Sequence, residues 1–230
     1  MEPIRGRTIE QNSGIQRPQA SALATNKVLR NTYMLLSLTL LFSGAVAGLS
    51  MALNLPHPGI IITLVGYFGL LFLTEKNKNS SAGLVCVFAL TGFMGYTLGP
   101  ILNAYISFLS NGAEIVMMAM GGTGIIFVGL SAYAITSGRR FSNWGAALTI
   151  GILLAFVAGI ANIWLQMPAL SLTVSSLFIL LMSGLILYQT GEIIHGGETN
   201  YISATVTLFV SIYNLFLSLL QLLGIFGGEE

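Results

Sequence analysis

The chain has 230 residues, of which 54% are hydrophobic and only 7% charged, and its formal net charge is +1. This composition excludes a water-soluble globular protein, because too few charged side chains are present to cover a soluble surface. A net charge this small also gives no reason to expect nucleic acid as a partner.

Residues 1–26 form a polar N-terminal segment rich in Gln, Asn, Ser, Arg and Pro. Such a segment buries too little apolar surface to offset the entropy of ordering, which predicts a mobile tail. A cleaved signal peptide ending near Ala45-Val46-Ala47 is the alternative. It is disfavoured because the apolar run and the polar segment ahead of it are both too long.

Seven apolar segments follow, each suited to crossing a hydrocarbon core of about 30 Å. They are expected over residues 31–53, 58–74, 81–101, 113–136, 141–165, 168–190 and 201–226. The predicted fold is therefore all-α: a polytopic seven-helix membrane bundle over residues 27–226, followed by a short C-terminal segment, 227–230.

The cationic side chains occupy the N-terminal segment and alternate loops. They are Arg5, Arg7, Arg17, Lys27 and Arg30, then Lys76 and Lys78, then Arg139 and Arg140. Because cytoplasmic loops carry the excess of Lys and Arg, the N-terminus is predicted to be cytoplasmic. Seven crossings then place the C-terminal segment on the periplasmic side.

Few side chains suited to catalysis are present. The chain has no aspartate, and its lone cysteine, Cys86, lies in an apolar segment and is interpreted as a packing residue. The two histidines, His57 and His195, are predicted at opposite membrane faces, and neither belongs to a zinc motif. Neither an enzyme nor a cofactor or metal site is expected.

Small residues recur at four-residue spacing in three segments: Gly44 and Gly48, Gly95 and Gly99, and Gly151, Ala155 and Gly159. Such stripes let helix backbones approach closely in a membrane, which predicts tight helix packing. A hinge or a self-association face is the alternative. Pro100, directly after Gly99, is predicted to end or kink the third helix.

The last segment carries a polar stripe at helical spacing: Thr207, Ser211, Asn214, Ser218 and Gln221. Polar groups facing hydrocarbon cost free energy, so this face is predicted to look into the bundle. Hydrogen bonding between helices and a water-filled or ion-accessible path both remain open as its role.

The C-terminal third also carries recognisable motifs. They are Leu187-Tyr188-Gln189-Thr190, Ile193-Ile194-His195-Gly196-Gly197-Glu198-Thr199-Asn200-Tyr201-Ile202 and Leu208-Phe209-Val210-Ser211-Ile212-Tyr213-Asn214-Leu215-Phe216. These segments resemble the signature of the Bax inhibitor-1 family. Lys27-Val28-Leu29-Arg30-Asn31-Thr32-Tyr33 and Gly99-Pro100-Ile101-Leu102-Asn103 are similar to its bacterial YccA branch, so the resemblance covers about residues 25–226.

The resemblance implies a bundle with six helices around a central seventh. In other branches of the family it implies a pH-sensitive calcium leak gated by two aspartates, whose positions here are Gln189 and Ser211. Neither side chain titrates in the relevant range, so a cation leak is kept only as the alternative function. A Glu192 side chain turned inward beneath Gln189 would be a substitute carboxylate; otherwise Glu192, Glu198 and Glu114 are interfacial.

For the bacterial branch, the resemblance implies an inner-membrane protein that binds the membrane-anchored, ATP-dependent protease FtsH and slows its degradation of membrane substrates. The expected partners are FtsH, its associated membrane regulators and the lipid bilayer. The N-terminal tail could serve as the segment that the protease grips and pulls, and a tightly packed bundle would resist extraction. These features predict that the protein acts as a slow, competing substrate of the protease.

Overall fold

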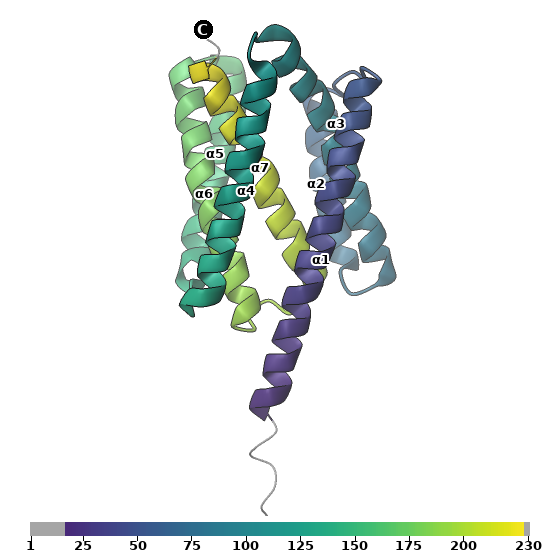
Figure 1. The fold of residues 1–230 in the computed structure, drawn as a ribbon, viewed down its shortest axis with the longest axis vertical. Coiled ribbons are helices and arrows are strands. Elements are labelled where there is room, and N and C mark those ends of the chain that lie inside the picture. Colours follow the sequence, from purple (N-terminus) through teal and green to yellow (C-terminus); the bar gives the residue numbers. More distant parts are fainter. Residues whose placement is uncertain (1–16, 228–230) are drawn as a thin grey trace, which may run out of the picture.

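The computed structural model describes residues 17–227, with side chains from residue 25 onward, and this part of the chain contains helices and no strand. The helices are α1 (Arg17–Ala52), α2 (Ile60–Asn77), α3 (Ser81–Phe108), α4 (Gly112–Ser137), α5 (Gly145–Leu165), α6 (Pro168–Ile194) and α7 (Tyr201–Gly227) (Figure 1). A short 3₁₀ turn, Ser142–Trp144, precedes α5. Each of the seven helices includes a span long and apolar enough to cross a membrane, which confirms the predicted fold class.

Helix α1 is longer than the sequence indicated. It begins at Arg17, so residues 17–26, assigned above to the mobile tail, are helical. Three alanines in this stretch favour helix, and Pro18 occupies the first turn, where its missing N–H costs no hydrogen bond. The rest of the predicted tail, residues 1–16, and the last three residues lie outside the described part.

Helix α7 lies at the centre of the bundle. It packs against α1, α2, α3, α4 and α6, whereas α5 packs against α6 and the 3₁₀ turn and does not reach α7. In Figure 1, α7 is visible between α4 and α1. The seventh helix is therefore central, as the resemblance implies, but five helices surround it rather than six.

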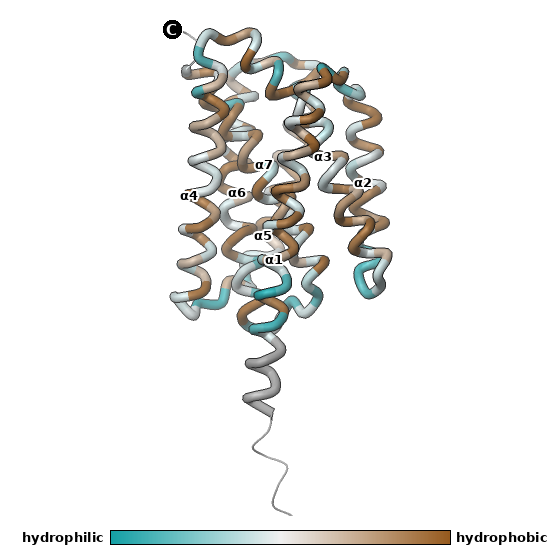
Figure 2. The backbone as a smooth tube through the Cα atoms, turned by 45° about the vertical axis from the view of Figure 1, so that its right-hand side comes forward, coloured by the Kyte–Doolittle hydropathy of each residue, from teal (hydrophilic) through white to brown (hydrophobic). Residues whose placement is uncertain are grey.

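The surface of the bundle matches a membrane environment. Figure 2 shows hydrophobic residues through the middle of the helices and hydrophilic residues concentrated at the turns. Large apolar side chains stay exposed on the outer helices, including Ile61 on α2 and Leu154 on α5. In hydrocarbon such exposure carries no penalty, so the outer faces are suited to lipid contact.

Helix α3 continues through Pro100 to Phe108, so the prediction that it ends at residue 101 is wrong. Proline has no N–H for the carbonyl of Tyr96, four residues earlier. That carbonyl accepts a hydrogen bond of 3.1 Å from the Ser50 hydroxyl of α1 instead. Neighbouring helices commonly satisfy backbone groups that proline frees in membranes, and here Ser50 does so.

Candidate functional site

Gln189 and Ser211, the positions that the resemblance assigns to an aspartate pair, lie on the adjacent helices α6 and α7 and are 5% and 0% exposed. The Ser211 hydroxyl donates a 2.7 Å hydrogen bond to the Thr207 carbonyl. The amide nitrogen of Gln189 is buried without a hydrogen-bond partner among the described residues. Because neither group ionises, this arrangement cannot change its charge with pH as two carboxylates do.

Helix α1 joins α6 and α7 close to this position. The Tyr33 hydroxyl lies 3.2 Å from the Thr190 hydroxyl of α6, directly after Gln189. On α7, the Thr205 hydroxyl lies 2.7 Å from the Tyr201 carbonyl of its own helix and 3.2 Å from the Thr32 carbonyl of α1, so these two carbonyls share its one proton. Neutral hydrogen bonds therefore connect three helices here.

Most of the polar stripe on α7 is satisfied within its own helix. The side chains of Thr207, Ser211 and Asn214 each donate to the carbonyl four residues earlier, at 2.7 to 3.1 Å. Ser218 is buried. Gln221 reaches α6, where it accepts a bond from Ser175 at 2.7 Å and donates to Ser171 at 2.5 Å. These contacts favour hydrogen bonding over an open polar path.

Asn200 connects the start of α7 to the loop between α2 and α3. Its side-chain oxygen accepts from the backbone N–H groups of Ile202 and Ser203, which caps α7. Its amide nitrogen donates to the carbonyl of Lys78 and to the side-chain oxygen of Asn79, at 3.1 and 2.8 Å. One side chain thus satisfies a helix end and joins two loops.

A charged pair lies beside this junction. Glu75 bonds to Lys78, and this hydrogen bond raises the pKa of the lysine. The second oxygen of Glu75 accepts from the Ser203 hydroxyl of α7 at 3.1 Å. The α2–α3 loop and the start of α7 therefore form one polar surface at the same end of the bundle.

Glu192 and His195 hold the end of α6 against the loop between α4 and α5. Glu192 accepts a 2.7 Å hydrogen bond from the Ser142 hydroxyl. The ring nitrogens of His195 lie 2.8 Å from the Gly191 carbonyl and 3.2 Å from the Gly138 carbonyl. The carboxylate of Glu192 is thus engaged with the α4–α5 loop.

The small residues fall into two groups. A Cβ atom at Gly95 or Gly99 of α3 would overlap Ser43 or Ser50 of α1, so these glycines permit close approach of the two helices. On α5, Gly151 contacts Leu181, Gly159 faces Val174 and Ala155 is buried. By contrast, a Cβ atom at Gly44 or Gly48 would meet nothing within 4 Å, so these two glycines do not serve close packing within the chain.

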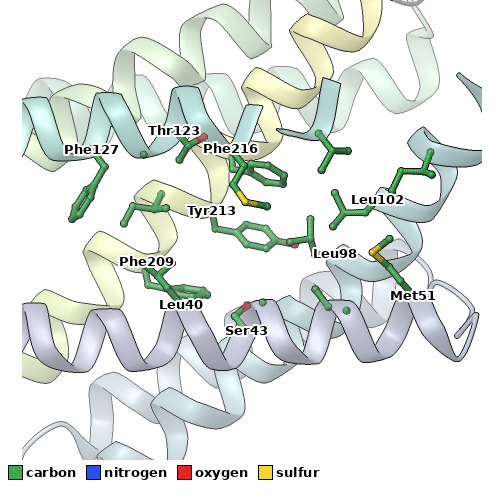
Figure 3. Close-up of a pocket in the computed structure, with 18 residues that line it drawn as sticks. Leu40, Ser43, Met51, Leu98, Leu102, Thr123, Phe127, Phe209, Tyr213 and Phe216 are labelled. Carbon is green, nitrogen blue, oxygen red and sulfur yellow. The ribbon is translucent and has the colours of Figure 1, made fainter. Parts of the chain in front are cut away.

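Gly44 and Gly48 line an apolar cavity of about 550 Å³ between α1, α3, α4 and α7 (Figure 3). Its floor includes Phe209, Tyr213 and Phe216 of α7, and none of the five stripe residues lines it. Sequence reasoning missed this cavity because its walls come from helices distant in sequence. It also missed Asn200, although an Asn directly before an apolar run is a helix-start signal.

Residues 25–228 match the family described as "Inhibitor of apoptosis-promoting Bax1". The chain belongs to the Bax inhibitor-1 family. As a Bax inhibitor-1 protein with seven apolar helices, it is a multi-pass membrane protein.

Two relatives within the Bax inhibitor-1 family resemble this chain over most of its length. "Modulator of FtsH protease YccA" of Escherichia coli K12 is 53% identical over 206 residues, covering 90% of this chain and 93% of the relative. An uncharacterized protein of Pseudomonas aeruginosa is 49% identical over 221 residues, covering 96% and 99%. The similarity to the YccA branch therefore extends over nearly the whole chain, and neither name describes an enzyme.

Proposed function

We propose that this chain is an inner-membrane protein that binds the FtsH protease and slows its degradation of membrane proteins. The observation that carries the proposal is the 53% identity to a relative named as a modulator of that protease. A relative from another Escherichia coli strain, also 53% identical over 206 residues, is named "Inner membrane protein YccA". The similarity covers 90% of the chain, so it includes most of the membrane bundle.

The proposed orientation places the N-terminus and the cationic loops in the cytoplasm. Asn200 bonds to Lys78, and His195 bonds to Gly138 beside Arg139, so both cationic loops lie at the end of the bundle where α6 meets α7. At the opposite end, the Asn111 side chain donates to the carbonyl of Gly227 near the C-terminus. This segregation of charge supports a cytoplasmic N-terminus.

In the proposed mechanism, FtsH engages residues ahead of α1 and then stalls on the bundle. Two features support slow extraction: glycines that let α1 and α3 pack closely, and hydrogen bonds that link α1 to α6 and α7. While the protease is engaged, it degrades other membrane substrates more slowly. The chain would thus act as a competing substrate.

A cation leak is the alternative function, and the neutral pair at Gln189 and Ser211 weakens it. Proteoliposomes loaded with a calcium indicator test it directly. A calcium flux that changes between pH 6 and pH 8 and falls in Glu192→Gln would favour the leak. We expect neither.

The modulator proposal is tested with purified FtsH and an integral-membrane substrate in reconstituted membranes. The full chain should slow degradation of the substrate, and deletion of residues 1–16 should abolish the effect while leaving α1 complete. Deletion of residues 228–230 is the matched control and should keep the effect. A chain lacking residues 1–16 that inhibits as well as the full chain would exclude the tail as the handle.

A further inference from the structure

The apolar cavity opens sideways, toward the lipid. The backbones of α1 and α4 do not pack against each other anywhere in the described residues, although both helices line the cavity. At its inner end, the ring centroids of Tyr33 and Phe127 lie 6.0 Å apart, so these two side chains bridge the two helices. The cavity is therefore a groove that is closed near the middle of the bundle and extends toward the end of α1.

The length of the groove matches one leaflet. On α1 it extends from Leu40, near the middle of the span Thr25–Ala52, to Met51 near its end. At 1.5 Å per residue this distance is about 16 Å. Half of a hydrocarbon core of about 30 Å is about 15 Å.

The length of the groove does not fit a spanning helix. A helix that crosses the hydrocarbon core is about 30 Å long. A groove of about 16 Å that is closed at its inner end by Tyr33 and Phe127 would hold only about half of such a helix. The groove therefore suits an occupant no longer than one leaflet, such as an acyl chain.

The lining offers an occupant almost no polar contact. The hydroxyl of Thr123 donates to the carbonyl of Ala119, and that of Tyr213 donates to the carbonyl of Met94. The floor side chains Phe209, Ile212 and Phe216 are wholly apolar. At the entrance, Gly44 and Gly48 of α1 and Gly124 of α4 leave open space where side chains would otherwise project.

We propose that this groove binds one acyl chain of a phospholipid from the leaflet on the side where α1 ends. In the proposed orientation this is the periplasmic leaflet. The acyl chain enters between α1 and α4, contacts the floor on α7 and fills the groove between α1 and α4.

The test uses the full chain in nanodiscs made with a phospholipid that carries a photoreactive diazirine partway along one acyl chain. After irradiation, adducts are mapped by peptide mass spectrometry. We expect adducts on the α7 floor, where Phe209, Ile212 and Phe216 are at most 8% exposed, as well as on freely exposed residues of α5. Absence of floor adducts would overturn the proposal, and a cross-link to a second copy of the chain at this groove would identify a protein occupant instead.

Two variants make the test specific. A Cβ atom at Gly44 or Gly48 would meet nothing within 4 Å, so the double variant Gly44→Leu/Gly48→Leu should keep the bundle while its side chains fill the entrance of the groove. The floor adducts should be lost and the α5 adducts retained. Gly69→Leu on α2, also in open space but outside the groove, is the matched control and should change neither. Floor adducts that persist in the double variant would contradict the proposal.

Discussion

At the scale of single residues, Asn200 combines two functions that are usually separate. Its oxygen caps the central helix, and its amide nitrogen joins that helix to the α2–α3 loop. An aspartate would keep the capping oxygen and lose the donors, whereas an alanine would lose both. The two contributions can therefore be separated by substitution.

We expect Asn200→Ala to lower the free energy of unfolding by about 1 to 2 kcal/mol, through loss of the cap and the loop contacts. Asn200→Asp should cost less, because a carboxylate caps a helix N-terminus well. Thermal unfolding of the purified variants in nanodiscs gives the comparison. Equal losses in both variants would show that the loop contacts, rather than the cap, carry the stabilisation.

Ser50 and Pro100 form a pair that a double-mutant cycle can test. Ser50→Ala leaves the Tyr96 carbonyl without a donor, which should cost about 1 kcal/mol of unfolding free energy. Pro100→Ala restores an N–H at residue 100, so Ser50→Ala should cost much less in that background. Additive losses, measured by chemical unfolding in detergent micelles, would contradict this account of how α3 passes its proline.

The buried Ser211 position should respond strongly to an ionisable side chain. Ionising a buried aspartate costs a desolvation free energy that the unfolded state does not incur. Ser211→Asp should therefore lose stability as pH rises and the carboxyl group becomes ionised. We expect its unfolding temperature to be higher at pH 5 than at pH 8, relative to the isosteric, non-titrating control Ser211→Asn.

At the scale of helices, identical glycine spacing has two different outcomes. Gly95 and Gly99 on α3 lie against the backbone and side chains of α1, whereas Gly44 and Gly48 on α1 face the groove. Spacing alone cannot distinguish these cases, because it gives the face of a helix and not the neighbour on that face.

We expect Gly95→Ala to lower the free energy of unfolding by about 1 to 3 kcal/mol, because its methyl group would overlap a backbone carbonyl of α1. Gly44→Ala, the control on the partner helix, should change stability by less than about 0.5 kcal/mol. Differential scanning fluorimetry of both variants is sufficient. A Gly44→Ala variant as unstable as Gly95→Ala would show that this part of α1 is also closely packed.

Most of the fold follows from hydropathy, whereas much of the site does not. Seven apolar runs place the helices, because membrane spans have a length set by the bilayer. The passage of α3 through Pro100 was not predictable, since it depends on a hydroxyl from another helix. The peripheral position of α5 and the presence of the groove also depend on which helices contact each other. The sequence of a single helix does not indicate its neighbours.

At the scale of the whole molecule, the proposed function links stability to inhibition. If FtsH stalls on the bundle, a less stable bundle is extracted sooner. We expect Gly95→Ala to be degraded faster than the unsubstituted chain and to inhibit degradation of a second substrate for a shorter time. A time course with both proteins labelled measures both rates, and Gly44→Ala should match the unsubstituted chain. A variant that is less stable but inhibits for equally long would separate inhibition from extraction.

The arrangement of α1 also determines how the bundle meets mechanical force. A pull on the N-terminus acts along α1, which lies against α3, α6 and α7. Force directed along these interfaces loads their contacts in shear, so many must rupture together. Peeling one helix sideways would break them one at a time. If a motor grips the N-terminus as proposed, it must rupture the contacts of α1 with three helices together before α1 can be drawn out.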